Sequence, residues 1–446
     1  MTEISQQSRT TTSSPAGLRR VVLAAIVGTA IEWYDFFLYA TAAGLIFASL
    51  FFAPAGEGFG TILAFFTVGI SFLFRPLGAF LAGHLGDRYG RKLVLMLTLI
   101  LMGVSTTLIG LLPTYGQIGM LAPILLVLLR VLQGISAGGE WGGAALLAVE
   151  HAPRARRGIF GASPQIGVPI GLLLSSGSLA LMTAIAPGDA FLQWGWRVPF
   201  LFSVLLIGVG VYIRRRVEET PVFEAMVAVK ARAKAPIAQL FRKHWRVLVL
   251  TGLVPVGSHA AGYMTTGGYI QRYATDPAGP VGLPTGQVLS AVTASAVTWL
   301  IFTLVGGWLT DRIGRKRTFL LAWVLLFVAV IVAFPLVNTG NIGLLFLGLV
   351  FLTVGLGLAN APLSTVFAEA FPSSVRFSGV SIAYAISAIV GGAFAPTIAT
   401  ALVQATGSTW SVSIYLLVMI AISVTAIICL RDRTGIDLGP QNDEER

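Results

Sequence analysis

Long apolar runs separated by short polar segments occupy almost the whole chain. A helix needs about 20 residues to cross the hydrocarbon core of a bilayer, so each run of at least about 18 apolar residues predicts a membrane-spanning helix. Twelve spans are predicted, near residues 20–52, 60–83, 92–112, 120–150, 158–186, 197–216, 247–274, 287–310, 317–337, 342–370, 377–404 and 410–430. The pattern therefore predicts an all-α integral membrane protein.

A ten-residue segment occurs twice along the chain. Gly83–Lys92 reads GHLGDRYGRK and Gly307–Lys316 reads GWLTDRIGRK, with seven identical residues at a spacing of 224 positions. Each copy joins two predicted spans, so we interpret the chain as two pseudo-symmetric six-helix halves. Internal repeats of this kind are typical of secondary transporters, whose substrate site lies between the repeats near the bilayer midplane.

The duplication divides the chain into five parts. They are a disordered cytoplasmic tail at 1–18, a six-helix half at 19–216, a cytoplasmic hinge at 217–246, a second six-helix half at 247–430 and a cytoplasmic tail at 431–446. Within the hinge, apolar residues share one helical stripe among basic neighbours, which favours a short helix along the membrane surface over a ligand site. The stripe consists of Ile237, Leu240, Phe241 and Trp245.

Composition and charge agree with a membrane protein. The chain is 55% hydrophobic and only 11% charged, and its 51 glycines suit closely packed membrane helices. The net charge of +11 does not indicate nucleic-acid binding, because Lys and Arg lie mainly in short loops on one side of the spans. Only Arg197 and Arg272 fall in loops on the other side, which predicts that both termini are cytoplasmic. The first apolar run is too long and too rich in acids for a cleaved signal peptide.

Several common kinds of site are not predicted. Cys429 is the only cysteine, and no pair of histidines has the spacing of metal ligands, so we expect neither a disulfide nor a metal site. The histidines are interpreted as satisfied or solvated groups. A phosphate-binding Gly-x-x-x-x-Gly-Lys-Ser/Thr loop does not occur in the sequence, which argues against ATP-driven transport. We expect no cofactor, no enzymatic activity and a monomer that works in the lipid bilayer.

Several sequence motifs resemble those of one transporter family. The two ten-residue segments resemble the signature of the major facilitator superfamily, and Arg130–Glu140 (RVLQGISAGGE) resembles the fourth-span motif of its proton-coupled members. Further segments are similar to its metabolite:proton symporter family. They are Gly28–Tyr39, Phe74–Gly78, Gly138–Gly143 and Trp194–Phe200.

The resemblance implies a major facilitator fold, a location in the bacterial inner membrane and transport of organic acids such as shikimate, 2-oxoglutarate or citrate, or of betaines. Two features depart from the family pattern. Thr29 stands where many members have Asn, and the short tail lacks the coiled coil of osmosensing betaine carriers.

All five charges that the sequence places deep in predicted spans belong to the first half. They are Glu32 and Asp35 in span one, Arg75 in span two, and Arg130 and Glu140 in span four. A charge at the bilayer centre is costly, so it is retained where it is paired, hydrated or functional. We therefore expect the first half to handle the proton and the charge of the substrate, while the second half closes over the site.

Asp35 is the main candidate for carrying the proton, and Glu32 is the second. A low-dielectric surround favours a neutral carboxyl group, which can then bind and release a proton during transport. The alternative is a permanent ion pair with an arginine that only holds spans together.

Arg75 is the candidate for binding a substrate carboxylate. Arg130 supports proton coupling in our interpretation, together with Gln133 and Glu140 on the same helix face. Because arginine stays charged, we expect both arginines to pair with the acids of span one in the empty carrier. Protonation of the acid would free an arginine for the substrate, which links binding to protonation. The alternative is a structural hydrogen-bonding cluster in span four.

Polar and aromatic residues complete the predicted substrate site. They are Tyr39, Gln133 and Trp141 in the first half and Tyr263, Asn360 and Tyr384 in the second. Tyr39 lies on the helical stripe of Asp35 and is the best hydroxyl donor there.

The repeated hairpins are predicted to form gates. Asp87 can face a helix N-terminus, and the arginines near it can contact acids in one conformation only. Simple orientation by positive charge is the alternative, and it does not explain the repeated Asp-Arg-x-Gly-Arg order. The predicted gating residues are Gly83, Asp87, Arg88, Gly90, Arg91, Glu150, Asp311, Arg312, Arg315 and Glu369.

The sequence therefore favours a secondary transporter that imports a small organic acid with protons through alternating access. An exporter that exchanges drugs or metabolites for protons would share the hairpins. Its fifth span is expected to carry Gly-Pro followed by paired glycines, unlike Gly167–Gly171 (GVPIG). A membrane sensor would need a signalling domain, and the sequence contains none.

Overall fold

The structure is a computed structural model of the chain. It describes residues 15–89, 91–138, 140–214 and 236–439, apart from the side chains of 15–21, 57, 83–89, 91–95, 214, 236–238 and 266. Among these residues, 11 helical segments are long and apolar enough to span a membrane. The third predicted span corresponds to α4 (Arg91–Leu111), whose described apolar part is Met96–Leu111. The prediction of an all-helical protein with twelve spans is confirmed.

Six spans form the first half. In chain order they are α1 (Pro15–Ala42) with η1 (Ala43–Phe47) and α2 (Ala48–Phe51), α3 (Glu57–Tyr89), α4, α6 (Leu121–Ala137) with α7 (Glu140–Glu150), α8 (Arg157–Gly161) with α9 (Ser163–Ile185), and η4 (Phe191–Gly195) with α10 (Arg197–Arg214). The short helices η2 (Ala53–Ala55), α5 (Tyr115–Ile118) and η3 (Arg154–Arg156) lie in the connections.

Six spans also form the second half. They are α13 (Trp245–Leu253) with α14 (Val256–Thr266) and α15 (Tyr269–Thr275), α16 (Thr285–Ile313), α17 (Arg315–Val337), α18 (Ile342–Asn360) with α19 (Leu363–Ala370), α20 (Arg376–Ser387) with η5 (Ala388–Ala393) and α21 (Ala395–Thr406), and α22 (Trp410–Cys429). The elements η1, η4 and η5 are π-helical turns, which widen a helix locally and are frequent at functional sites.

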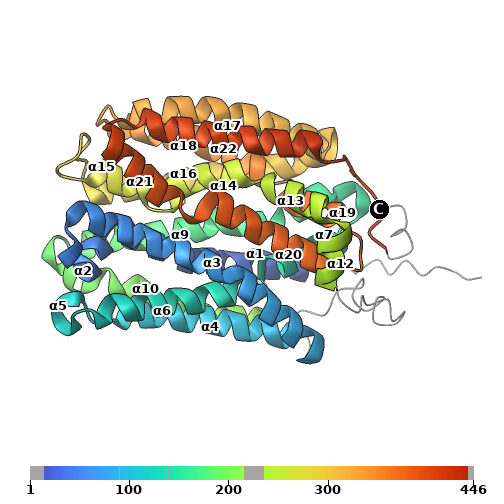
Figure 1. Ribbon diagram of the computed structural model, residues 1–446, viewed down its shortest axis with the longest axis horizontal. Helices are drawn as coiled ribbons and strands as arrows, with labels where there is room; N and C mark the ends of the chain where they lie inside the picture. Colours follow the sequence, from blue (N-terminus) through green and yellow to red (C-terminus); the bar gives the residue numbers. More distant parts are fainter. Residues whose placement is uncertain (1–14, 90, 139, 215–235, 440–446) are drawn as a thin grey trace, which may run out of the picture.

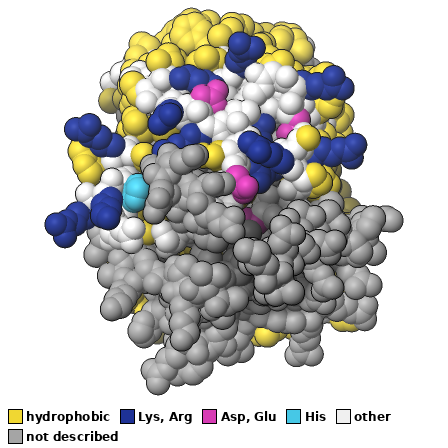
Figure 2. Space-filling view, turned by 90° about the vertical axis from the view of Figure 1, so that its right-hand side faces the viewer, with side chains coloured by type: hydrophobic (Ala, Val, Ile, Leu, Met, Phe, Trp, Pro, Cys, Tyr) yellow, Lys and Arg dark blue, Asp and Glu magenta, His cyan; other side chains and the backbone are white. Residues whose placement is uncertain are grey.

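The spans run side by side along the long axis of the molecule, with the first half below the second in Figure 1. The halves meet where α9 packs on α16, α3 on η5 and α7 on α20. One end of the bundle holds α12 (Pro236–Lys243), α19 and the C-terminal segment (Figure 1). The described part of this end carries many Lys and Arg side chains (Figure 2), and we call it the basic end.

Glycines set the contact between spans two and four. A Cβ atom on Gly134 would lie 2.1 Å from the carbonyl oxygen of Ser71, and one on Gly138 would lie 2.1 Å from that of Arg75. Two glycines four residues apart thus let α6 approach the backbone of α3 closely, as is common between membrane helices. This contact places Arg75 beside the span that carries Arg130.

The second ten-residue segment joins α16 to α17. Two of its glycines, Gly307 and Gly314, stand where the backbone leaves no room for a side chain or adopts a positive φ. Gly314 adopts a φ of 91°, which favours glycine. A Cβ atom on Gly307 would lie 2.9 Å from that of Ala162, so this glycine lets α16 approach span five. In the first copy, Gly90 and the side chains of Gly83–Lys92 lie outside the described residues.

A helix, α12, lies at the position where the hinge stripe predicts one. Leu240 is buried, whereas Phe241 and Trp245 are 54% and 52% exposed. Basic residues, Arg242 and Lys243, form its last turn. The helix contacts both α13 and α20, so it connects the hinge to the start of span eleven.

Candidate functional site

The five deep charges that the sequence singles out are all buried. Glu32, Asp35, Arg75, Arg130 and Glu140 are each 3% exposed or less. They come from α1, α3, α6 and α7 of the first half. The structure divides them into an arginine–glutamate pair that faces the second half, a hydrogen-bonded arginine, and two further acids, Asp35 and Glu140.

Arg75 pairs with Glu32. The Nη2 atom of Arg75 lies 3.7 Å from Oε1 of Glu32, and its guanidinium lies 4.4 Å from the ring centroid of Phe72. The Nε atom of Arg75 has no hydrogen-bond partner among the described groups. Its charge acts on Tyr263 and Tyr384, so Arg75 lies where the first half meets the second.

Arg130 makes contacts with neutral groups and no ion pair with a described residue. Its guanidinium donates to the carbonyl oxygens of Thr67 (3.1 Å) and Val68 (2.9 Å) and to Oε1 of Gln133 (2.7 Å). It also lies 3.9 Å from the ring centroid of Tyr39. The expectation that both deep arginines pair with an acid is wrong for Arg130, because two backbone carbonyls of α3 and an amide occupy its donors.

Two predicted substrate residues are therefore occupied within the first half. Gln133 accepts from Arg130 and donates to the hydroxyl of Thr106 at 2.8 Å. The hydroxyl of Tyr39 lies 2.6 Å from that of Thr67, so Tyr39 does not serve Asp35 as a donor. Both residues fit the alternative of a structural hydrogen-bonding network around Arg130.

Asp35 is fully buried and forms no ion pair with any described residue. Ser203 of α10 donates a hydrogen bond to its Oδ1 at 2.6 Å, and Oδ2 has no hydrogen-bond partner among the described groups. Thr106 and Glu140 both interact with this carboxyl group. The alternative of a permanent pair between Asp35 and an arginine therefore does not hold in this structure.

Aromatic rings close the space between the halves. Trp141 of α7 lies flat on Tyr384 of α20, with ring centroids 3.8 Å apart and planes at 7°. Tyr263 of α14 packs 5.5 Å from Phe36 and 5.5 Å from Phe72. The predicted substrate residues Trp141, Tyr263 and Tyr384 are thus brought together with Arg75.

Polar atoms that have no hydrogen-bond partner among the described groups lie on or beside these rings. They are Nε1 of Trp33 and Trp141, Nε of Arg75, Nδ1 of His259 and Oη of Tyr263. A buried polar group without a partner is costly, so these atoms favour a polar occupant of the site. Oδ1 of Asn360, the last residue of α18, also has no partner among the described groups, and the side chain is 7% exposed; its place in the substrate site stays a prediction.

The halves touch at the end opposite the basic end. A Cβ atom on Gly44 of η1 would lie 2.6 Å from the carbonyl oxygen of Gly268, and Phe66 packs against Phe394 with ring centroids 5.3 Å apart and planes at 31°. These contacts lie beyond the aromatic rings, so they cover the site from that side.

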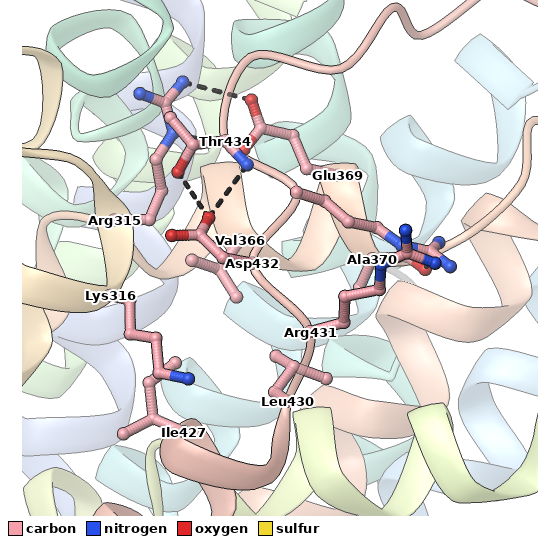
Figure 3. Close-up of a pocket in the computed structure, with 11 residues that line it drawn as sticks. Arg315, Lys316, Val366, Glu369, Ala370, Ile427, Leu430, Arg431, Asp432 and Thr434 are labelled. Atoms are coloured by element: carbon pink, nitrogen blue, oxygen red, sulfur yellow. Dashed lines mark hydrogen bonds and ion pairs between the residues drawn. The ribbon is translucent and has the colours of Figure 1, made fainter.

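Ion pairs join the halves at the basic end. Arg315 holds Glu369 through two hydrogen bonds of 3.1 and 3.0 Å, and Arg157 of the first half lies 3.8 Å from the same carboxylate. Arg376 of the second half pairs with Glu150 of the first at 3.2 Å. Figure 3 shows Arg315 and Glu369 side by side at this end.

Asp311 adds a contact to a helix end. Its carboxylate accepts the backbone N–H groups of Gly158 (2.6 Å) and Ile159 (2.9 Å), in the first turn of span five. Free N–H groups and the positive end of the helix dipole stabilise an anion there. Asp311 of the second hairpin therefore contacts a helix N-terminus, which is the contact that the sequence predicts for Asp87 of the first hairpin.

Other predicted gate residues have partners at the basic end or lie at its surface. Arg312 is exposed, 5.5 Å from the ring of Trp308, and makes no ion pair with a described group. Glu150 and Glu369 pair with Arg376, Arg315 and Arg157, and their predicted contacts with the first hairpin stay a prediction. The predicted gate residues Gly83, Asp87, Arg88, Gly90 and Arg91 lie outside the described side chains.

Sequence reasoning missed three contributors. Arg157 and Arg376 precede spans five and eleven at equivalent places in the two halves, and that position was interpreted only as positive charge that orients the chain. Ser203 gave no signal, since a serine in an apolar span is common and its partner Asp35 is 168 residues away.

Comparison with known proteins matches this architecture along the whole chain. The family model described as "Sugar (and other) transporter" matches residues 21–248, and the model of the major facilitator superfamily matches residues 260–446. The chain belongs to the major facilitator superfamily. It is a transporter of this superfamily and not an enzyme.

Named relatives place it among metabolite transporters. It is 39% identical to the inner membrane metabolite transport protein YhjE of Escherichia coli (strain K12), over 92% of this chain and 93% of that protein. It is 36% identical to the shikimate transporter of the same organism, over 94% and 96% of the two chains. The proline/betaine transporter of that organism is 33% identical, over 93% and 84%.

A solved structure supports the fold. The proton:xylose symporter XylE bound to 6-bromo-6-deoxy-D-glucose superposes with a TM-score of 0.73 at 17% identity, over 95% of this chain and 98% of that one. The expected major facilitator fold is confirmed.

Proposed function

We propose that the chain imports a small metabolite bearing a carboxylate, together with protons, across the bacterial inner membrane by alternating access. The basic end lies in the cytoplasm in this proposal, because Lys and Arg are retained on that side of a membrane, and both termini lie there too. The substrate site is the cluster of Arg75, Glu32 and the aromatic rings between the halves.

The pair of Arg75 and Glu32 carries the proposal. Arg75 is 3% exposed, and at 3.7 Å from Glu32 it has a carboxylate partner that the protein itself supplies. Protonation of Glu32 removes that partner's charge and leaves a buried guanidinium, which is strongly unfavourable unless another anion takes its place. A substrate carboxylate fits this need, since it can accept two parallel N–H groups of the fork.

Binding and protonation are then coupled. The empty carrier holds Arg75 with ionised Glu32, and the loaded carrier holds Arg75 with the substrate while Glu32 carries a proton. The charge inside the bilayer is the same in both states, so either one can cross between conformations at low cost. A carrier that has bound only the substrate or only the proton carries an extra buried charge. This charge makes the change between the two conformations unfavourable.

Asp35 is the neighbouring proton site in this scheme. It lies three residues from Glu32 on α1, so the two carboxyl groups share a helix face. Asp35 is fully buried and forms no ion pair with a described group, so its surroundings suit a carboxyl group that carries a proton. We propose that Asp35 holds the proton that Glu32 exchanges with substrate.

Relatives support the carboxylate. Shikimate and proline, named for two relatives, both carry a carboxylate group, whereas they differ in the rest of the molecule. This fits a site in which Arg75 holds the carboxylate and the other residues of the cluster set specificity for the rest of the molecule.

Alternating access would proceed by breaking the contacts at the basic end. Arg157–Glu369, Arg376–Glu150 and the contact of Asp311 with span five all cross between the halves. Their loss opens the site to the cytoplasm, while the contacts around Gly44 and Gly268 keep the other end closed.

A thermal-shift screen of the purified protein tests the proposal. Organic acids, betaines, sugars and drugs are compared at pH 5.5 and pH 7.5, because a ligand stabilises the folded carrier by mass action. We expect an acid to stabilise the protein, and more so at the lower pH. Stabilisation by drugs alone, or outward transport of the acid in exchange for protons in vesicles, would favour the exporter instead.

A further inference from the structure

The imidazole ring of His259 lies inside the proposed substrate site. It is 8% exposed, on α14, with its centroid 5.5 Å from that of Tyr384 and 6.3 Å from that of Tyr263. Tyr384 also hydrogen-bonds Arg75, so one tyrosine ring links His259 to the arginine that is proposed to bind the carboxylate. The sequence interpretation of the histidines as satisfied or solvated groups does not fit His259.

Hydrogen bonding defines which nitrogen is available. The ring bonds the backbone of Ser387, at the junction of α20 and η5, and Nδ1 has no partner among the described groups. A neutral imidazole carries one N–H and one lone pair, and the N–H is used on the carbonyl of Ser387. The ring therefore presents Nδ1 to the site as an acceptor of a hydrogen bond.

A second acceptor lies in the same half. Oδ1 of Asn360 is buried and has no hydrogen-bond partner among the described groups. Acceptors of this kind need a donor, which a simple carboxylate or a quaternary ammonium group does not supply. A hydroxyl group supplies it.

We propose that His259 determines specificity by accepting a hydrogen bond from a hydroxyl group of the transported acid, so that the substrate class is hydroxy-carboxylates. This inference rests on the proposed function, because it assumes that Arg75 holds the carboxylate. A site built around a hydroxyl discriminates strongly against the analogue that lacks it, since its own polar atoms are then left without partners.

Matched pairs of acids test this inference. The probes are 4-hydroxycyclohexanecarboxylate against cyclohexanecarboxylate and lactate against propionate, with binding measured by calorimetry on the purified full-length protein. We expect the hydroxylated member of at least one pair to bind about tenfold or more tightly. His259→Leu should abolish that preference and leave the affinity for the deoxy member nearly unchanged. His259→Gln, which keeps an acceptor oxygen, should retain part of it, and His151→Leu at the basic end is the matched control.

The outcomes separate the two proposals. Failure of all carboxylates to bind the wild-type protein contradicts the proposed function. Binding of carboxylates without a hydroxyl preference, or a preference that survives in His259→Leu, contradicts only the role of His259. If His259→Leu does not fold, the wild-type preference and its reduction in His259→Gln decide the question.

A separate set of contacts concerns the segment after the last span. Residues 431–439 return across the basic end (Figures 1 and 3), and Leu438 is buried at 3% exposure. We call this segment the strap. Its backbone, rather than its side chains, makes most of the contacts described below.

The strap bonds both halves at once. From the first half, Arg154 donates to the carbonyl oxygen of Gly435 and Arg157 donates to that of Ile436 at 2.5 Å. From the second half, Glu369 accepts the N–H of Gly435 at 3.2 Å and Arg376 donates to the carbonyl oxygen of Leu438 at 2.9 Å.

These partners are the residues that close the basic end. Glu369, Arg157 and Arg376 also form the ion pairs between the halves, so the strap can make all its contacts only while the halves are close. From this arrangement we infer that the strap is a latch that stabilises the state closed to the cytoplasm and so regulates the opening of the carrier.

Labelling of a cysteine under the strap tests the latch. Thr365 is buried and donates to the carbonyl oxygen of Arg157 at 3.0 Å, so it lies at the contact between the halves. Thr365→Cys in a Cys429→Ser background should react with an impermeant maleimide in inside-out vesicles about threefold or more faster after truncation at residue 430. Truncation at residue 439, which keeps the strap, is the control.

Leu438→Asp in the full-length chain provides a second route, because it disrupts the strap without removing it. An increase in labelling in either disrupted form, compared with the control, supports the latch. Equal labelling in all forms contradicts it, and a truncated protein that fails to fold leaves Leu438→Asp to decide.

Discussion

Arg75 and Glu32 lie 3.7 Å apart in the interior of the first half, next to the ring of Phe72 and facing the tyrosines of the second half. The other deep arginine, Arg130, has its donors taken by neutral groups. Arg75 is thus the deep cation whose partner is a carboxylate. Exchange of that carboxylate for one on the substrate explains how a transporter can couple a proton to an acid.

Substitution of Arg75 measures how much the two parallel N–H groups of its guanidinium contribute to substrate affinity. Arg75→Lys keeps the charge but loses the planar pair of N–H groups, so binding of a carboxylate substrate should weaken by about 1–3 kcal/mol. Arg75→Ala should weaken it further. Calorimetry with an acid found in the thermal-shift screen measures both effects, and Arg272→Lys, in a half-buried pair with Asp276 away from the proposed site, is the matched control. Unchanged affinity in both Arg75 variants would make Arg75 a structural charge and reopen the substrate class.

Asp35→Asn removes the carboxyl group that is proposed to hold a proton and keeps the shape of the side chain. We expect this variant to lose uphill accumulation driven by a pH gradient while it still exchanges labelled for unlabelled substrate, because exchange needs no net proton movement. Reconstituted vesicles measure both activities, with the exposed Asp189→Asn as the control. Normal accumulation in Asp35→Asn would exclude a role as proton carrier.

Asp311→Asn weakens the contact between the second hairpin and span five. Loss of a charged group that accepts N–H groups at a helix start costs about 0.5–2 kcal/mol, which shifts the balance between conformations about 2- to 30-fold toward the state open at the basic end. Transport should slow far more than substrate binding weakens, since Asp311 lies away from the substrate. Counterflow rates and calorimetry measure the two quantities, with Asp276→Asn as the control. Equal changes in rate and affinity would argue against a gate, and by the repeat we expect Asp87→Asn to act in the same way.

The fold was predictable because a bilayer restricts it strongly. Only hydrogen-bonded helices or closed barrels satisfy the backbone inside lipid, so long apolar runs indicate helices directly. The repeated hairpins add the two-half arrangement, and Gly314 shows why the repeat keeps a glycine there. The exact packing of the two halves was not predictable, since it depends on contacts such as that of Gly134 with Ser71.

The buried charges were predictable from the sequence, and their pairings were less so. A charged side chain in an apolar run stands out in any sequence, so the burial of Glu32, Asp35 and Arg75 could be expected, while their roles in transport stay predictions. The partners of Arg130 could not be found, because they are backbone carbonyls of α3 that every residue has. Arg157 and Arg376 carried the same signal as ordinary basic loop residues, and only their distances to Glu369 and Glu150 distinguish them.

The most direct measurement of the central claim is the affinity for an identified acid between pH 5.5 and 8.5 in the wild-type protein and in Glu32→Gln. Raising the pH ionises Glu32, and ionised Glu32 holds Arg75, so wild-type affinity should fall by up to about tenfold per pH unit once the group has lost its proton. Glu32→Gln cannot ionise and should bind the acid tightly and almost independently of pH. If Glu32→Gln keeps the wild-type pH dependence, Glu32 and the substrate do not compete for Arg75.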